Sequence, residues 1–381
     1  MKKVKRLLAK SSMTPDAPRG EQTLPGHTAS VLAAAKTLLE QTGESQLFSV
    51  GLTPDRWYEL FKRGVMIAAF CHDLGKANDQ FQRMVRREST AKQAVRHEAL
   101  SLLIVHETDL FAWLKSGLQD GITLDLFLWA ASGHHRKFPP PKPEPGTGAR
   151  LSLFLGHADF HRTLTVGAKW LDLNDPPSLT DQDWTLTGLN SPSQRLHKFA
   201  VRAAAYWDTC TDDQRRFLAI VKACVIAADV AGSALPKEHK KIGQWITEVV
   251  RHRPKPGQLM KIVTDRLGGH PPRPFQETLG CTKTRVVLAQ AGCGSGKTVA
   301  AYLWAARRFR ERRLFFCYPT TGTATEGFRD YLVDPTLDAQ LVHGRAAVDL
   351  ELLGVDDASE RVDPIAALNT WSTLASDQLH G

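Results

Sequence analysis

The stretch FCHDLGKANDQF, residues 70–81, sets a histidine beside an aspartate at the end of a long amphipathic segment. In the preceding residues, DRWYELFKRGVMIAAF (55–70), apolar side chains recur at three- and four-residue spacing, which predicts a helix. Because neighbouring helical residues point about 100° apart, His72 and Asp73 can both lean into one pocket, and Lys76 reaches the same rim. Imidazole and carboxylate together can hold a metal ion. A lone His-Asp dipeptide is weak support for such a site, since chance and helix ends supply many.

Side chains of the same kind recur on both sides of this pair. His27 opens an amphipathic segment in PGHTASV, His97 lies in RHEALS, and His134 and His135 are consecutive in ASGHHRKF. Each histidine has a structural alternative as a helix cap, a surface residue or part of a loop. Asp229 lies in the apolar run IAADVAGSAL, where a carboxylate is costly to bury without a cation or hydrogen-bond donors.

The residues around these side chains predict a mainly helical domain. Helical spacing of apolar residues recurs over 27–41, 55–75, 97–115, 123–135 and 212–235. A proline-rich stretch at 137–150 indicates a loop inside this domain, and two more, at 251–258 and 268–274, indicate an interdomain linker. We therefore expect a basic tail over 1–20, an all-α helical bundle over 21–250, a linker over 251–273 and a second domain over 274–381.

The pattern changes after the linker. TRVVLAQ (284–290) has the apolar run of a buried parallel strand, the glycine-rich AGCGSGKT (291–298) follows it, and TVAAYLWAARRFRERR (298–313) has helical spacing. LFFCYPT (314–320) and TEGFRDYL (325–332) predict a second strand and a second helix. We therefore expect the start of an α/β nucleotide-binding lobe.

The glycine-rich loop fits the phosphate-loop pattern A-x-x-x-x-G-K-T, with Ala291 where a glycine usually stands. Backbone N–H groups of such a loop can cradle a phosphate at a helix N-terminus. Lys297 would reach the β and γ phosphates, and Thr298 would bind Mg²⁺. We predict that ATP with Mg²⁺ binds here, through Gly292, Gly294, Ser295, Gly296, Lys297 and Thr298.

The net charge and the cysteine pattern limit which partners and which cellular compartment are plausible. The chain has 49 Lys and Arg against 40 Asp and Glu, a net charge of +9, with basic clusters at its start, at 83–87 and at 307–313. This balance favours a polyanionic partner, although any one cluster could be a solvated helix face. The six cysteines show no C-x-x-C spacing and mostly lie in apolar runs, which is typical of buried thiols in a reducing compartment. No apolar run approaches the roughly 20 residues that span a bilayer, so we expect a cytoplasmic protein.

The order of histidines and aspartates on a helical domain resembles the HD phosphohydrolase superfamily in its two-metal form. The resemblance covers about residues 20–245 and implies an ion held by His27, His72, Asp73 and Asp229 and a second held by His97, His134 and His135, with Asp73 bridging them. Imidazole ligands favour Mn, Fe, Co, Ni or Zn over Mg, and a carboxylate bridge keeps two such ions about 4 Å apart. Asp73 and Lys76 would be the catalytic residues, Lys76 offsetting charge on the phosphoryl group.

Segments flanking the phosphate loop resemble superfamily 2 helicase motifs. By that resemblance Gln276 in RPFQ would read the adenine edge and Phe275 would stack near it, while Pro319, Thr320 and Thr321 would touch a nucleic-acid backbone. An HD nuclease domain before a RecA-like helicase lobe resembles the type I CRISPR-associated nuclease-helicase. The resemblance implies cleavage of single-stranded DNA, an RNA-guided surveillance complex as partner, and a role in antiviral defence.

Two features of that family are missing. A helicase of this type needs a D-E-x-H box and a second lobe, and neither 341–352 nor 376–381 supplies the box. We therefore expect a lobe that is truncated and that binds ATP weakly without hydrolysing it, unless a separate chain supplies the missing half. Two alternatives to a DNA nuclease stay open, namely an HD enzyme acting on small nucleotides and a non-catalytic remnant that binds DNA or ATP.

Overall fold

The structure is a computed structural model that describes residues 5–12, 14–90, 93–118, 124–133, 150–188, 190–253, 255, 257–310, 312–337, 339–343 and 346. Contacts divide the chain into two compact units, Met1–Val250 and Arg251–Gly381.

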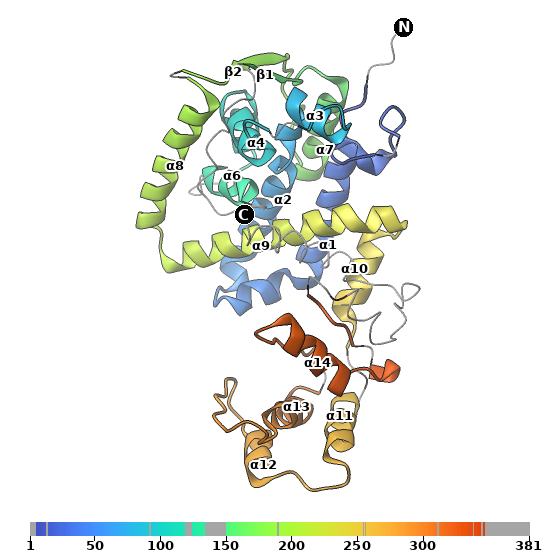
Figure 1. Ribbon diagram of the computed structural model, residues 1–381. Helices are drawn as coiled ribbons and strands as arrows, with labels where there is room; N and C mark the ends of the chain where they lie inside the picture. Colours follow the sequence, from blue (N-terminus) through green and yellow to red (C-terminus); the bar gives the residue numbers. More distant parts are fainter. Residues whose placement is uncertain are drawn as a thin grey trace. The chain divides into compact units, whose positions relative to one another are not determined.

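The first unit is a helical bundle, as the apolar spacing predicts (Figure 1). Its helices are α1 (Leu24–Ser49), α2 (Pro54–Cys71), α3 (Asp79–Val85), α4 (His97–His106), α5 (Leu110–Lys115), α6 (Leu124–Ser132), α7 (Ala158–Leu171), α8 (Pro192–Thr209), α9 (Asp212–Ala234) and α10 (Ile242–Arg251), with short 3-10 turns η1 (Gly20–Gln22), η2 (Leu74–Lys76) and η3 (Leu235–Glu238). The helix expected over 97–115 is two helices, because the polar residues 107–109 interrupt the apolar run.

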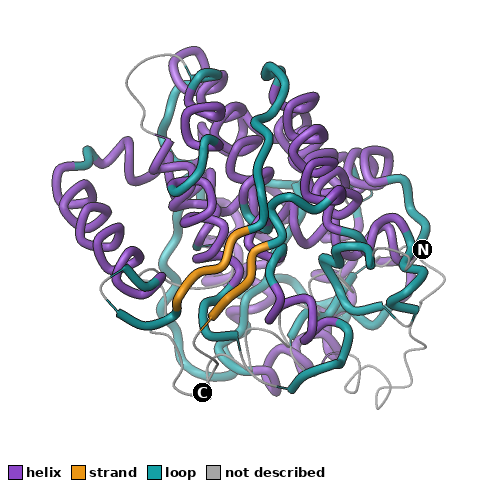
Figure 2. The backbone as a smooth tube through the Cα atoms, turned by 90° about the horizontal axis from the view of Figure 1, so that it is seen from above, coloured by secondary structure: helices purple, strands orange, loops and turns teal. Residues whose placement is uncertain are grey.

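A two-stranded antiparallel sheet, whose strands are separated in the sequence by α7, covers one end of this bundle (Figure 2). Strand β1 (Arg150–Leu153) pairs antiparallel with β2 (Gln182–Thr185), and Leu151 lies opposite Trp184. Leu151 and Leu153 are buried, so the short RLSL alternation puts one face of the two-stranded sheet on the core. The sequence prediction missed both strands, because runs of four residues are too short to stand out as alternating patterns.

Helix α1 packs against α2, α7 and α9. The contact between α1 and α9 is close because Gly232 has no side chain: a Cβ there would lie 2.8 Å from both the Cα and the N of Val31. Gly232 is one turn beyond Asp229, and Val31 is one turn beyond His27. The close approach therefore brings the two candidate metal-binding residues to the same level of the bundle.

The expected basic tail contains an ordered segment, residues 5–12, which we call the N-terminal strap. Leu8 is fully buried and forms an antiparallel β-bridge with Thr23. Leu7 and Ala9 are buried as well. The strap is therefore part of the helical unit.

Helix α9 passes the composition test for a membrane span. It has 23 residues, and 44% of its most apolar window is buried. The expectation that no apolar segment approaches this length therefore has one exception. Core helices pass the same test, and α9 packs against α1, α2 and α6 in the core of the unit.

The second unit has four helices in its described residues. They are α11 (Gln258–Leu267), α12 (Pro274–Cys281), α13 (Lys297–Arg308) and α14 (Thr321–Tyr331), followed by a 3-10 turn η4 (Pro335–Leu337). Tyr302 is buried at the centre of an apolar cluster with α11 and stacks on Phe316 and Tyr331. Three cysteines of this unit, Cys281, Cys293 and Cys317, are exposed, contrary to the expectation of mostly buried thiols.

The α/β architecture expected for this unit is not confirmed. Residues 284–290 and 314–320 are described and neither segment is a strand. Three of their apolar side chains are largely exposed to solvent, namely Val286 (86%), Leu288 (95%) and Phe315 (77%). A strand is stable only when its backbone groups pair with a neighbour, and the described part of this unit places no paired strand beside them.

Candidate metal centre

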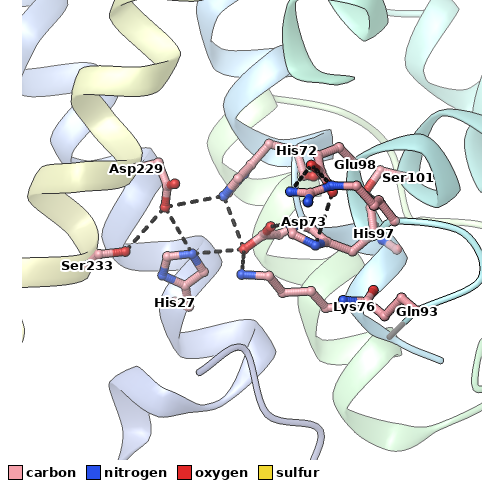
Figure 3. A network of polar contacts seen from close by, with 12 residues as sticks. His27, His72, Asp73, Lys76, Gln93, His97, Glu98, Ser101, Asp229 and Ser233 are labelled. Atoms are coloured by element: carbon pink, nitrogen blue, oxygen red, sulfur yellow. Dashed lines mark hydrogen bonds and ion pairs between the residues drawn. The ribbon is translucent and has the colours of Figure 1, made fainter. Parts of the chain in front are cut away.

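Four elements of the helical unit converge on Asp73 (Figure 3). Thr23 caps α1 by accepting a hydrogen bond from Gly26, and His27 lies in the first turns of that helix. His72 ends α2, Asp73 follows it, and His97 opens α4. Asp229 reaches the same place from α9, near its C-terminal end.

One carboxylate oxygen of Asp73 faces two histidines and a lysine. Asp73 Oδ2 lies 3.0 Å from His27 Nε2, 3.2 Å from His72 Nε2 and 2.5 Å from Lys76 Nζ. Asp229 Oδ1 closes this side, at 3.3 Å from His27 Nε2 and 3.7 Å from His72 Nε2. Two imidazoles and two carboxylates therefore share one small space.

The other oxygen faces α4. Asp73 Oδ1 lies 3.3 Å from His97 Nε2. His97 Nδ1 in turn lies 3.2 Å from Glu98 Oε2, and Arg96 Nε donates to Glu98 Oε1 at 2.7 Å. Asp73 thus offers one oxygen to each side, which is the arrangement that a bridging carboxylate needs.

The ring of His72 is oriented by its own helix. His72 Nδ1 lies 2.6 Å from the carbonyl oxygen of Ala69, a distance at which Nδ1 carries the proton and donates it. Nε2 is then the ring nitrogen that faces the two carboxylates, at 3.2 Å from Asp73 Oδ2 and 3.7 Å from Asp229 Oδ1. An imidazole oriented in this way by a backbone carbonyl is typical of metal ligands.

The turn after Asp73 is tied to α4 by a buried hydroxyl. Ser101 Oγ accepts from Gly75 N at 2.8 Å and lies 3.0 Å from His72 O and 2.9 Å from His97 O. Gly75 is required here because a Cβ would lie 2.1 Å from the His97 carbonyl oxygen. This contact holds His72 and His97 in register.

Burial and neighbouring opposite charges shift the pKa values of the acids and bases in this centre in opposing directions. Burial alone would lower the pKa of His72, but the carboxylates of Asp73 and Asp229 outweigh it and raise the pKa to about 10. Burial and the charge of Lys10 lower the pKa of His27. Burial would raise the pKa of Asp73, yet His72 and Lys76 hold it well below its usual value. The carboxylates are therefore ionised and the site attracts cations.

The donor set fits a transition-metal ion. His27, His72 and Asp73 present ligand atoms that all lie within 4.8 Å of one another. Both ring nitrogens of His27 are buried, and among the described residues no group makes a hydrogen bond of good geometry to them. Such buried nitrogens are expected where an ion belongs. His134 and His135, predicted as ligands, lie outside the described residues.

Three supporting residues were missed by the sequence prediction. Glu98 and Ser101 lie in the same RHEALS stretch as His97, and Ser233 Oγ donates to Asp229 Oδ1 at 3.3 Å. Burial would raise the pKa of Glu98, but His97 and Arg96 lower it to about 2, so it is a carboxylate. The signal in the sequence was position alone: Glu98 directly follows His97, and Ser101 and Ser233 lie four residues after His97 and Asp229, one helical turn on.

The phosphate loop of the second unit has the backbone that its glycines predict. Gly294 and Gly296 adopt positive φ angles of 72° and 87°, and α13 begins at Lys297. Lys297 Nζ donates to the carbonyl oxygens of Ala291 and Gly292, at 2.9 and 2.8 Å. The lysine therefore lies over the loop that would hold a phosphate.

The predicted adenine-reading residues lie beside this loop. Gln276 is buried, its Oε1 accepts from Arg273 N at 2.8 Å, and its Nε2 donates to Gly296 O at 3.2 Å. Phe275 is half-buried next to it. Thr320, predicted to touch nucleic acid, caps α14 by accepting from Thr323 N.

Comparisons with known proteins agree with this geometry. The family model "Cas3, HD domain" matches residues 8–235, which include His27, His72, Asp73, His97 and Asp229. A CRISPR-associated nuclease/helicase Cas3 of Myxococcus xanthus (strain DK1622) is 45% identical over 384 residues, covering 98% of this chain and 51% of the relative. The chain thus spans about half the length of that relative. No solved structure gave a significant match.

Proposed function

Because the chain belongs to the family of the Cas3 HD domain, whose members are CRISPR-associated, metal-dependent HD nucleases, we propose that it cleaves phosphodiester bonds of single-stranded DNA in antiviral defence. The observation that supports this most is the two-sided Asp73 carboxylate, with His27, His72 and Asp229 around one oxygen and His97 at the other. We assign the first set to one divalent ion and His97, with His134 and His135, to a second.

Divalent ions held there would activate water for attack on phosphorus and neutralise the phosphoryl oxygens. The chain's own residues would position the ions and the phosphate. Asp73, fixed between α1, α2 and α4, sets the spacing of the ligands. The ammonium group of Lys76, which lies 2.5 Å from Asp73 Oδ2, would pair with the phosphate as negative charge develops on it.

The decisive experiment is cleavage of single-stranded DNA by the purified chain with Mn²⁺ or Ni²⁺. D73N should abolish cleavage and metal binding, because a neutral amide cannot bridge two cations. The matched control is D125N, since Asp125 Oδ1 also lies 3.0 Å from a histidine, His106 Nε2, away from this centre. Undiminished cutting by D73N would place the active site elsewhere.

The same assay separates the alternative functions. Release of mononucleotide products from nucleoside phosphates, with DNA left intact, would indicate a small-nucleotide phosphohydrolase. Absence of any hydrolysis by a metal-loaded chain would indicate a binding module.

We further propose that the phosphate loop binds ATP with Mg²⁺ weakly and without turnover. Lys297, whose Nζ is held by the loop carbonyls, would exchange them for phosphate oxygens. K297A should remove ATP binding measured by calorimetry and leave DNA cleavage unchanged. Steady ATP hydrolysis by the chain alone would contradict the proposal.

The partners proposed are single-stranded DNA, an RNA-guided surveillance complex and a separate chain that supplies further helicase elements. The exposed apolar residues Val286, Leu288 and Phe315 are consistent with such a chain. A cytoplasmic location is proposed as well, supported by free, buried Cys71, Cys210 and Cys224.

A further inference from the structure

Gln82, on α3, has a buried amide that holds two other segments of the helical unit together. Its Nε2 donates to Lys76 O at 2.9 Å and to Leu8 O at 2.8 Å, and its Oε1 accepts from Leu8 N at 2.9 Å. The residue is 6% exposed, so these hydrogen bonds are made away from water. The amide therefore ties the N-terminal strap to η2, the turn that carries Lys76.

The turn η2 depends on contacts of this kind because it is only three residues long. A 3-10 turn of this length has little stability of its own. The amide of Gly75 is held by Ser101 Oγ of α4, at 2.8 Å, and the carbonyl oxygen of Lys76 is held by Gln82 of α3. The backbone that follows Asp73 is thus fixed from two different helices.

The side chain of Lys76 is confined at its far end as well. Its ammonium group lies 2.5 Å from Asp73 Oδ2 and 5.4 Å from the centre of the Phe81 ring, which is close enough for a cation–π interaction. Phe81 directly precedes Gln82 and is buried in an apolar cluster with Leu8 of the strap. Two consecutive residues of α3, both in contact with the strap, therefore hold the two ends of a side chain that is otherwise flexible.

The partners of the Gln82 amide fix which way it points. Two carbonyl oxygens face its N–H groups and one backbone N–H faces its oxygen, so the amide makes three of the four hydrogen bonds that it can form. An apolar side chain here would leave the Lys76 carbonyl oxygen without this donor. The bond to Lys76 O is not needed to fix the strap, and it indicates a role for Gln82 at the turn.

Building on the proposed nuclease function, we infer that Gln82 is a positioning residue that acts through Lys76. It fixes the main chain of Lys76, so that the ammonium group stays beside Asp73, where it would pair with the phosphate of a bound strand. The backbone of Leu8 supplies two of the three hydrogen bonds that orient this amide. The N-terminal strap is therefore the anchor of the device and belongs functionally to the metal centre.

The test compares Q82M, Q82N and Q80M in the full chain. Q82M keeps the length of the side chain and removes its three hydrogen bonds, whereas Q82N keeps an amide and shortens its reach by one methylene. Gln80 lies on the same helix, and its Oε1 accepts from Ala94 N at 2.8 Å, so Q80M is the matched control. Acetylation of Lys76 in the metal-free chain is followed by mass spectrometry relative to the exposed Lys36, and cleavage of single-stranded DNA is measured with Mn²⁺.

Lys76 is 8% exposed, so its acetylation should be slow in the wild type. We expect Q82M to speed this acetylation about tenfold and to lower kcat about tenfold, with KM changed by less than about twofold, because the contact serves the transition state. Q82N should show a smaller change in the same direction, and Q80M should show none. In a double-mutant cycle, K76M/Q82M should be no slower than K76M, since Gln82 acts through Lys76.

Three results would overturn the inference while leaving the nuclease proposal intact. They are unchanged acetylation in both Gln82 variants, an equal rise in Q80M, which would indicate general loosening of α3, and a Q82M defect that multiplies the defect of K76M. If the wild-type chain cut no DNA but Q82M still speeded the acetylation of Lys76, the nuclease proposal would fail and the positioning of Lys76 would stand.

Discussion

Replacing Gly232 by alanine should weaken metal binding, although Gly232 is not itself a candidate ligand. A Cβ at this position would lie 2.8 Å from the backbone of Val31, whereas ordinary contacts begin at 3.4 Å. Neither helix backbone can yield locally, so α9 must move away from α1 by roughly 0.6 Å. Asp229 moves with α9, and its Oδ1 would retreat from His27 Nε2, now 3.3 Å away.

The expected magnitudes differ for stability and metal binding. Overpacking costs about 1–3 kcal/mol, and the better helix propensity of alanine offsets about 1 kcal/mol of it. Metal–ligand distances tolerate only about 0.2 Å, so a shift of this size should weaken metal binding by about 10–100-fold. Metal affinity should therefore fall far more than the free energy of unfolding.

The measurements are urea unfolding of the metal-free chain and calorimetric titration with Mn²⁺. Gly243→Ala is the control, because its Cβ would lie 3.4 Å from Thr37 Oγ1, an ordinary contact of α10. This control should bind metal as the wild type does. If Gly232→Ala bound Mn²⁺ within twofold of the wild type, the close approach of α9 to α1 would not set the ligand geometry.

Three more predictions concern other parts of the chain. Burial would raise the pKa of Asp159, but Arg6 and the Leu7 amide outweigh burial and lower it, so ionised Asp159 stabilises the fold above about pH 4 and this stabilisation is lost as the pH falls further. The difference in unfolding free energy between the wild type and D159N should therefore become smaller on acidification. A difference that stays constant with pH would contradict this. S101A leaves the buried amide of the turn after Asp73 without its acceptor and should cost about 1–3 kcal/mol in urea unfolding, so a neutral result would show that this tie is dispensable. Changing Val286 and Leu288 to serine should leave the melting temperature unchanged, because both are exposed, and should reduce self-association in light scattering; a lower melting temperature would mean that they pack inside the unit.

The helical unit could be predicted because its signals are local. Apolar spacing over 55–70 and 212–235 follows the 3.6-residue period, and α2 and α9 appear where that spacing places them. The strands expected at 284–290 and 314–320 are not formed, and the reason is that strand formation depends on non-local contacts. Their apolar runs predict burial against neighbours, and strand formation depends on a partner that the run itself cannot specify.

The identity of the candidate ligands was also open to prediction, since His72, Asp73 and Asp229 are unusual residues for the apolar runs around them. The residues that support these candidate ligands could not be predicted. Ser101 and Gln82 are ordinary polar residues, and only the structure shows that both of them hold the turn after Asp73.

The amino-acid order alone thus indicated that the first unit is mainly helical and which side chains have metal-binding chemistry, because both depend on residue type and short-range spacing. Tertiary packing alone decided that one oxygen of Asp73 faces His27 and the other faces His97, and that Ser101 of α4 holds the turn after Asp73. Those distances depend on how closely the helices approach one another, as at Gly232, and no local pattern encodes an interhelical distance.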